Sequence, residues 1–530
     1  MRTALLALLV ASLAFTGEAA YRRGKLLWSC DFTAGEIKSL REAGNDLTPF
    51  WQADEGRAGD GALHFRSKGA GALAKLYVPK EPFAGIVQIE ADVKGVDVGR
   101  GPQRFHGPKV MFPHMVNGKK KYPQMDAEYG SWDWKTCVKL EAFGGKSEPP
   151  EYFTLGLEQA AGELWIDSVR VYATEEVPDE APAVAPPNPR AEKIPRGPYY
   201  GRRRPGGYRG VMSPGKVASI TEDDIVTLHA WNANLIRLQI QFKRKLIKSE
   251  ADYDRFVEEC LPEVDRVLAL CRRYGIKVVL DLHTPPGTHA NKYAGNMIPA
   301  DYDTTQLRRT WRTLASRYSG DPVLYGYDIL NEPGCAPQAW DRIFRETVAE
   351  IRKVDAKTPV LTYFLTTYYP EEMNVIYSPH CYEPHSITHL GVGAPPGAEV
   401  VRWSYGNYVD GVFWNADQLR VGYFDRGILS FRLAHPKARM LLGEFSCIAW
   451  TKGAADYIRD AIALCEEYDI DWAYHAFREA KMWDVEYEST DGVPNVSHLV
   501  KATKDTDRKK ALLAGLALNG PRKQAKKPAK

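Results

Sequence analysis

The sequence predicts an α/β fold, a (β/α)8 barrel, preceded by an all-β sandwich of jelly-roll type. Two observations carry this prediction: strand-like runs with a period of two come before a Pro-rich stretch, and apolar runs alternate with amphipathic segments after it. Eight such strand–helix repeats are typical of a closed parallel barrel. A doubly wound open sheet is the alternative, but no glycine-rich turn follows the first strand of the second part.

The first residues have the pattern of a removable signal peptide, which we place at residues 1–19. A positive residue, Arg2, is followed by the apolar stretch 4–15 and then by Gly17-Glu18-Ala19, in which the first and third residues are small. The apolar stretch is too short to span a bilayer as a lasting helix. No other segment approaches the ~18 apolar residues of a membrane span. We therefore expect a secreted or periplasmic protein without a membrane anchor.

Residues 22–174 are predicted to form the β-sandwich. Alternating runs at 87–93, 153–157 and 164–172 are separated by Gly, Pro and Asp, as in antiparallel strands. The run from Gly162 to Val169 resembles the last strand of jelly-roll carbohydrate-binding modules. Trp51, Trp132 and Trp134 are candidates for stacking on sugar rings. A spacer domain whose tryptophans belong to its core is the alternative.

Two segments of biased composition bound the second domain. Residues 175–198 are rich in proline and predict an extended linker, and residues 521–530 are rich in lysine and predict a disordered tail. The net charge is only +3, and the tail supplies much of it, so no nucleic-acid partner is expected. The 8 cysteines show neither a disulfide framework nor a zinc motif, and most of them are interpreted as core residues.

The predicted barrel domain covers residues 199–520. Between its second and third strands, apolar residues at positions 256, 260, 264, 267 and 271 line one face of a helix. The eight strands are expected to begin near residues 210, 235, 276, 324, 360, 375, 440 and 470.

Side chains at the carboxyl ends of barrel strands face the reaction site, and here most of these ends are polar. The residues concerned are Arg237, His283, Asn331, Glu332, His380, Tyr382, Glu444, Trp472 and His475. Hydrolysis of a glycosidic bond requires two carboxyl groups that flank it. Glu332 ends strand four and Glu444 ends strand seven, which lie on opposite sides of the barrel mouth.

This part of the chain resembles glycoside hydrolase family five, the cellulase-type enzymes, most clearly over the stretch from Tyr318 to Pro333. The resemblance implies that Glu332 is the acid/base and Glu444 the nucleophile. It also implies that Asn331 holds the 2-hydroxyl, that Arg237 and Tyr382 bond the nucleophile, and that His283 and His380 line the subsite of the cleaved sugar. Arg237 should favour an ionised Glu444, while Glu332 must stay protonated.

One departure concerns strand eight, where many family members carry a tryptophan platform and this chain has His475. Trp472 or Trp483 is expected to replace it. The aromatic-rich connection after strand six is a candidate wall of the cleft, and packing of this connection on itself is the alternative. We expect a monomeric retaining glycosidase that acts on β-1,4-glucan or β-mannan without metal or organic cofactor. β-1,3-Glucan, a glycolipid or an oligosaccharide are alternative substrates, and a non-catalytic sugar-binding protein is the alternative function.

Overall fold

The computed structural model divides the chain into two compact units. The first comprises residues up to 186 together with 393–413, and the second comprises the remainder. None of the helices among the described residues combines the length and apolarity needed to cross a membrane. The predicted signal peptide, most of the lysine-rich tail and the middle of the predicted linker lie outside the described residues. These are 21–521 except 100, 102–104, 126–128, 177–187, 243–245, 288–297, 394–399 and 411.

The first unit is built from two antiparallel sheets. The larger sheet has the order β2-β3-β11-β5-β9, with β1 also paired to β11, and the smaller sheet has the order β4-β10-β6. The antiparallel region that the sequence predicts is therefore confirmed. Its elements are β1 (Tyr21–Cys30), α1 (Ala34–Glu42), β2 (Trp51–Gln52), β3 (Ala62–Lys68), β4 (Ala72–Tyr77), β5 (Gly85–Val98), β6 (Gly107–Met111), β7 (His114–Val116), β8 (Lys119–Lys121), β9 (Gly130–Phe143), β10 (Tyr152–Glu158) and β11 (Ala161–Glu176).

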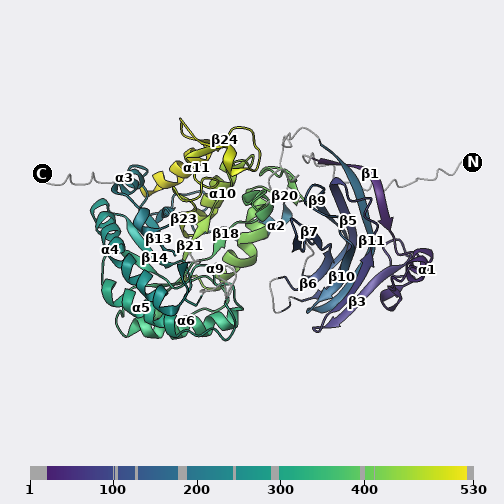
Figure 1. Ribbon diagram of the computed structural model, residues 1–530, viewed down its shortest axis with the longest axis horizontal. Helices are drawn as coiled ribbons and strands as arrows, with labels where there is room; N and C mark the ends of the chain where they lie inside the picture. Colours follow the sequence, from purple (N-terminus) through teal and green to yellow (C-terminus); the bar gives the residue numbers. More distant parts are fainter. Residues whose placement is uncertain are drawn as a thin grey trace, which may run out of the picture. The chain divides into compact units, whose positions relative to one another are not determined.

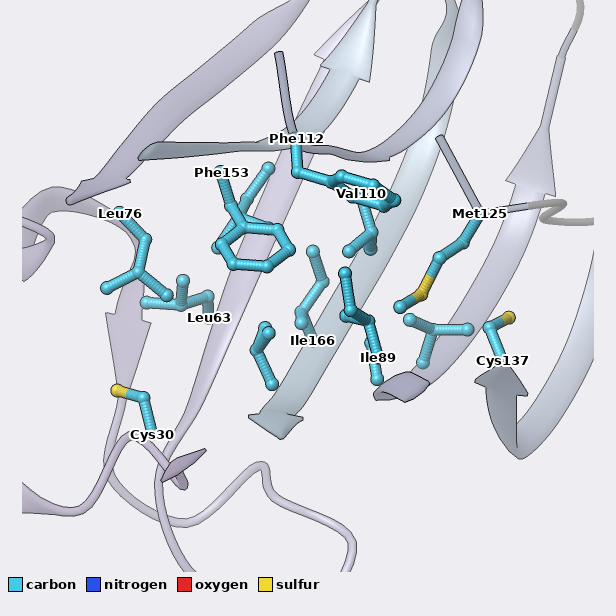
Figure 2. Packing of buried hydrophobic residues seen from close by; sticks show 14 of the residues in the cluster. Cys30, Leu63, Leu76, Ile89, Val110, Phe112, Met125, Cys137, Phe153 and Ile166 are labelled. Atoms are coloured by element: carbon cyan, nitrogen blue, oxygen red, sulfur yellow. The ribbon is translucent and has the colours of Figure 1, made fainter. Parts of the chain in front are cut away.

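The hydrophobic core of this unit contains residues of both sheets. Leu63 and Ile89 contribute from the larger sheet, and Leu76 and Phe153 from the smaller (Figure 2). Each of them has no exposed surface. Because successive residues of a strand point to opposite faces, the period-two alternation in the sequence supplies one apolar face per sheet. Burial of these two faces against each other stabilises the sandwich.

Two of the tryptophans considered for sugar stacking serve the sandwich itself. The indole N–H of Trp51 donates to the carbonyl of Phe32 at 2.8 Å, and the ring of Trp132 packs over Gly95, where a side chain would collide with it. Both rings also pack against the core. For these two residues the structure favours a role in the core of the domain over stacking on sugar rings.

Residues 393–413 belong to the first unit although they lie between barrel strands in the sequence. They contain a short hairpin, β19 (Tyr408–Val409) and β20 (Val412–Phe413). The carboxylate of Asp410, between these strands, accepts from Nζ of Lys139 at 2.6 Å and from the backbone N–H of Leu140 at 3.0 Å. Beside them, burial together with the charge of Asp410 raises the pKa of Glu141 to about 7, although Lys139 opposes this shift. The connection after strand six is therefore tied to β9.

The second unit contains a closed barrel of eight parallel strands, as the sequence predicts. Helices α4, α5 and α6 cover its outer side (Figure 1). In order around the barrel the strands are β12 (Arg209–Met212), β13 (Leu235–Ile240), β14 (Lys277–Leu282), β15 (Leu324–Asp328), β16 (Val360–Thr362), β17 (Val375–Tyr377), β21 (Arg439–Leu442) and β23 (Asp471–Tyr474).

The helix α4 (Glu250–Tyr274) illustrates how local sequence sets these elements. The Ser249 side chain caps its first turn by accepting from the N–H of Asp252, and Gly275 ends it in a left-handed conformation at φ 66°. Cys260, Val264 and Cys271 are buried, which confirms the predicted apolar face. The other α-helices of this unit and its π-helix η6 are α2 (Pro189–Lys193), α3 (Glu222–Ala230), α5 (Thr305–Tyr318), α6 (Pro337–Arg352), α7 (His385–Thr388), α8 (Ala416–Leu419), η6 (Arg420–Leu429), α9 (Ser430–Ala434), α10 (Ala454–Glu467) and α11 (Asp507–Leu516).

Candidate active site

Two glutamates meet at the carboxyl ends of barrel strands four and seven. Glu332 follows β15 and has a positive φ of 39°, and Glu444 follows β21. Glu444 begins the short strand β22 (Glu444–Phe445), which pairs with β18 (His380–Cys381) so that His380 lies opposite Glu444. One side-chain oxygen of each glutamate and a ring nitrogen of His380 all lie within 4.8 Å of one another. The barrel thus brings together two carboxyl groups that are distant in the sequence.

Glu444 is buried and held as a carboxylate. Arg237 donates from Nη1 to its Oε1 at 2.7 Å, and the hydroxyl of Tyr382 donates to its Oε2 at 2.8 Å. Burial by itself raises the pKa of Glu444, but the positive charges of His380, His475 and Arg237 outweigh burial. The pKa of Glu444 therefore lies far below its ordinary value. The resemblance implies both of these hydrogen bonds, and the structure contains them.

Arg237 organises the floor of the site. Its guanidinium has no exposed surface and pairs with Asp328 at 2.9 Å, with Asp281 at 3.2 Å and with Glu444. It also donates to the amide oxygen of Asn331 at 2.9 Å. Burial lowers the pKa of Arg237, but the three carboxylates more than reverse this, so the guanidinium stays charged. A buried charge requires such partners.

Glu332 shares a hydrogen bond with His380, whose Nδ1 lies 2.7 Å from its Oε1. Its side chain is 44% exposed, so a substrate can reach it. Burial raises the pKa of this carboxyl, but the hydrogen bond and charge of His380 outweigh burial, and the pKa of Glu332 lies below its ordinary value. This differs from the expected protonated Glu332. The physical reason is that the hydrogen bond from the adjacent His380 ring favours the ionised form of Glu332.

His283 and Asn331 complete the polar ring. Nδ1 of His283 lies 2.8 Å from Oδ2 of Asp281, and its Nε2 lies 3.3 Å from the amide nitrogen of Asn331. Burial lowers the pKa of His283, but Asp281 reverses the shift and leaves that pKa above its ordinary value. The predicted ring residues therefore lie in one hydrogen-bonded network around the two glutamates.

The prediction that Trp472 contacts the substrate is wrong. Trp472 has no exposed surface, its indole N–H donates to Glu466 on α10 at 3.0 Å, and its ring packs against Gly515 on α11. It therefore supports the outer side of the barrel wall. Trp483 is only partly buried and lies beside His475, with ring centroids 5.2 Å apart. Of the two tryptophans, only Trp483 can present a ring to a sugar.

Two residues of this network were not anticipated from the sequence. Glu479 follows strand eight, and its Oε2 lies 3.2 Å from Nε2 of His475. Gln239, near the end of β13, donates to the same carboxylate at 3.0 Å. A glutamine inside an apolar strand was a visible signal, whereas Glu479 lies in a connection without periodicity.

Among the described residues, the cluster of Glu332, His380 and Glu444 is the group that could hold a metal ion. One imidazole and two carboxylates suit several divalent cations. The same atoms are engaged in hydrogen bonds with one another and with Arg237 and Tyr382. These hydrogen bonds therefore give a second explanation for why the three side chains lie together.

A barrel that brings two glutamates from strands four and seven to one polar site defines a glycoside hydrolase. Residues 205–477, just over half of the chain, match the family Cellulase (glycosyl hydrolase family 5). The chain therefore belongs to glycosyl hydrolase family 5.

The chain is also similar to several named proteins. The chain is 26% identical over 318 residues to Endoglucanase C of Acetivibrio thermocellus, covering 53% of this chain and 90% of that protein. It is 27% identical over 197 residues to Cellodextrinase A of Ruminococcus flavefaciens, covering 33% and 55% of the two chains. The crystal structure of Pseudomonas stutzeri endoglucanase Cel5A superposes with a TM-score of 0.42 and 16% identity, covering 60% of this chain and 98% of that one.

Proposed function

We propose that this glycoside hydrolase cleaves β-1,4-glucan by double displacement, with Glu444 as nucleophile and Glu332 as acid/base. The observation that carries the proposal is the pair of carboxyl groups whose oxygens lie within 4.8 Å. Retaining glycosidases hold their carboxyl groups about 5–5.5 Å apart, whereas inverting enzymes leave roughly 6.5–9.5 Å for a water molecule. The shorter separation supports attack by Glu444 itself.

The environments of the two glutamates support this assignment of roles. Glu444 receives two strong hydrogen bonds, from Arg237 and Tyr382, that fix its carboxylate for attack on the anomeric carbon. Glu332, which shares a proton with His380, gives that proton to the leaving oxygen as the glycosidic bond breaks. In the second step Glu332 takes a proton from water, the water oxygen bonds to the anomeric carbon, and Glu444 leaves as a carboxylate.

The substrate assignment rests on the relatives. Endoglucanase C and Cellodextrinase A carry names that refer to glucan chains, which favours glucan over mannan for this chain. A weaker match to a probable glucan 1,3-beta-glucosidase of Emericella nidulans, 28% identical over 152 residues, keeps β-1,3-glucan as the second candidate. A reducing-sugar assay on carboxymethylcellulose, laminarin, mannan and cello-oligosaccharides separates these candidates.

The mechanism is tested by the variant Glu444→Gln, with Glu488→Gln as the matched control. Glu488 is an exposed residue of β24 (Tyr487–Ser489), so its amide variant should keep the wild-type rate. Glu444→Gln should lose at least 10³-fold in kcat because the covalent intermediate cannot form. A Glu444→Gln variant with the rate of the control would refute the mechanism. An inverted product anomer, detected by NMR during hydrolysis, would refute double displacement.

We also propose that the protein is exported. The positive residue Arg2, the apolar stretch 4–15 and the small residues Gly17 and Ala19 support removal of a signal peptide. Expression of the complete gene in a secreting host should yield extracytoplasmic protein whose mature amino terminus lies close to residue 20. Recovery of the unprocessed chain from the cytoplasm would contradict this proposal.

A further inference from the structure

A chain of polar contacts continues beyond the nucleophile, at the position where many family members carry a tryptophan. Nδ1 of His475 lies 3.0 Å from the hydroxyl of Tyr382, the same hydroxyl that donates to Glu444. Nε2 of His475 lies 3.2 Å from Oε2 of Glu479. The His475 side chain is only 14% exposed. Both of its ring nitrogens are therefore engaged in a partly closed environment.

The donor and acceptor roles in these hydrogen bonds determine the protonation state of His475. Glu444 is a carboxylate and can only accept, so Tyr382 must donate to it. The one hydroxyl proton of Tyr382 is thereby used, and its oxygen can only accept from His475. Nδ1 of His475 consequently carries a proton. On the other side of the ring Nε2 faces a second carboxylate and also carries one, which makes His475 an imidazolium.

Glu479 is itself held as an acceptor by Gln239. The amide nitrogen of this fully buried glutamine donates to Glu479 at 3.0 Å and to the carbonyl of Ser213 at 3.2 Å. Reversal of the amide would place its oxygen against two acceptors, so its orientation is fixed. Burial raises the pKa of Glu479, but His475 and Gln239 outweigh burial and leave this pKa below its ordinary value. The pair is therefore a carboxylate beside a cation.

We propose that His475 and Glu479 form a positioning pair that places a positive charge behind Tyr382 and thereby favours departure of the nucleophile from the covalent intermediate. The inference rests on the proposed function, since it requires Glu444 to form that intermediate. A neutral tryptophan at this position supplies no such charge. This chain would therefore partition differently between its two chemical steps from family members that carry the tryptophan.

The charge acts in opposite directions on the two steps. In glycosylation a Glu444 oxygen bonds to the anomeric carbon, the leaving oxygen takes the proton of the Glu332–His380 pair, and Glu444 loses its negative charge. A neighbouring cation opposes that loss. In deglycosylation water bonds to the anomeric carbon and gives a proton to Glu332, while the electron pair of the ester bond returns to Glu444. The cation stabilises the carboxylate that forms.

The test measures both steps with 2,4-dinitrophenyl β-cellobioside, whose leaving group makes deglycosylation rate-limiting. The variants are Glu479→Gln, which keeps the shape but removes the carboxylate, and His475→Asn, which keeps a donor near the position of Nδ1 without the charge. Glu488→Gln is the control. Each of the two variants should lower kcat about tenfold, the difference between a charged and a neutral hydrogen bond. KM should fall by more than kcat, because loss of the cation also speeds glycosylation, so that kcat/KM, which reports glycosylation, should rise.

The pH profile gives a second readout. Burial lowers the pKa of His475, but Glu479 and Glu444 more than reverse this, so that pKa lies above its ordinary value. Loss of the Glu479 charge lowers it, so the fall of kcat on the alkaline side should begin at lower pH in Glu479→Gln than in the wild type. The other titratable groups that act on His475 are Tyr382, His283 and His389.

The outcomes distinguish this inference from the proposed function. Accumulation of a wild-type adduct on Glu444, seen by mass spectrometry of the quenched reaction, supports the pair when both variants also show a fall of kcat and a larger fall of KM. Unchanged kcat, or a fall of kcat/KM with KM constant, overturns it while leaving the double displacement intact. A wild type that releases no dinitrophenolate, or a fully active Glu444→Gln, overturns the proposed function itself.

Discussion

Replacement of Arg237 by methionine removes the guanidinium that pairs with Asp281, Asp328 and Glu444. These four groups carry a formal charge of −2 in the wild type and −3 in the variant, all of it buried, and uptake of one proton restores −2. A carboxyl group with an ordinary pKa near 4 costs about 4 kcal/mol to hold protonated at pH 7, at 1.36 kcal/mol per pH unit. This figure agrees with the roughly 3–5 kcal/mol found when one partner of a buried ion pair is removed.

The pH dependence of this loss has a definite sign. In the wild type the lowered pKa of Glu444 contributes stability above the unfolded pKa near 4, and this is lost as the pH falls. In Arg237→Met the carboxyl group that takes up the proton has a raised folded pKa, so its destabilising effect grows as the pH rises. The difference in unfolding free energy should therefore be about 4 kcal/mol at pH 7 and about 1.4 kcal/mol at pH 5.

The assay is urea-induced unfolding of the full chain at pH 5, 6 and 7, followed by tryptophan fluorescence. Arg255→Met is the control, because Arg255 is 55% exposed and its ion pairs are worth at most about 1 kcal/mol. A loss of stability in Arg237→Met that is the same at all three pH values would refute the reasoning. A loss no larger than that of the control would do so as well.

Three further predictions concern the site. His380→Asn removes the hydrogen bond and charge that lower the pKa of Glu332, so the alkaline limb of kcat/KM should move to higher pH, and an unmoved limb would contradict the shared proton. Trp472→Ala should lower the unfolding free energy by about 3–5 kcal/mol without raising KM, because Trp472 is fully buried. Trp483→Ala should raise KM with little loss of stability, because its partly buried ring lies beside His475. The reverse pattern would restore Trp472 as a substrate contact. Incubation with EDTA should leave the hydrolysis rate unchanged, because the atoms that could bind an ion are already engaged in hydrogen bonds. A loss of activity that a divalent cation reverses would contradict this prediction.

The barrel could be predicted because each of its strands is a short apolar run that is buried on both sides. The position of Glu332 and Glu444 follows from that prediction alone, since the carboxyl ends of parallel strands share one rim. The partners of Arg237 were harder to foresee. Asp328 and Asp281 lie inside neighbouring strands, and their approach to Arg237 depends on the register between β13, β14 and β15. Register is not encoded in the periodicity of any single strand.

Other features could not be predicted from the sequence for related reasons. Whether a tryptophan faces the cleft or the helices depends on which side of its strand it occupies, and Trp472 occupies the outer side. Glu479 joins the network around the site through His475 and Gln239, which come from different strand ends. The contact between Lys139 and Asp410 joins residues 271 positions apart, and neither residue type is unusual for a surface.

That contact has a consequence for the synthesis of the chain. Because residues 393–413 complete the first unit, the sandwich cannot reach its final form on the ribosome until six of the eight barrel strands have been made. A fragment that stops at residue 176 would lack Asp410, which pairs with Lys139 and lies beside Glu141. A fragment that starts at residue 199 would carry the 21 residues 393–413 without the rest of the first unit. Engineers who wish to exchange either half must therefore transplant two separate pieces of sequence.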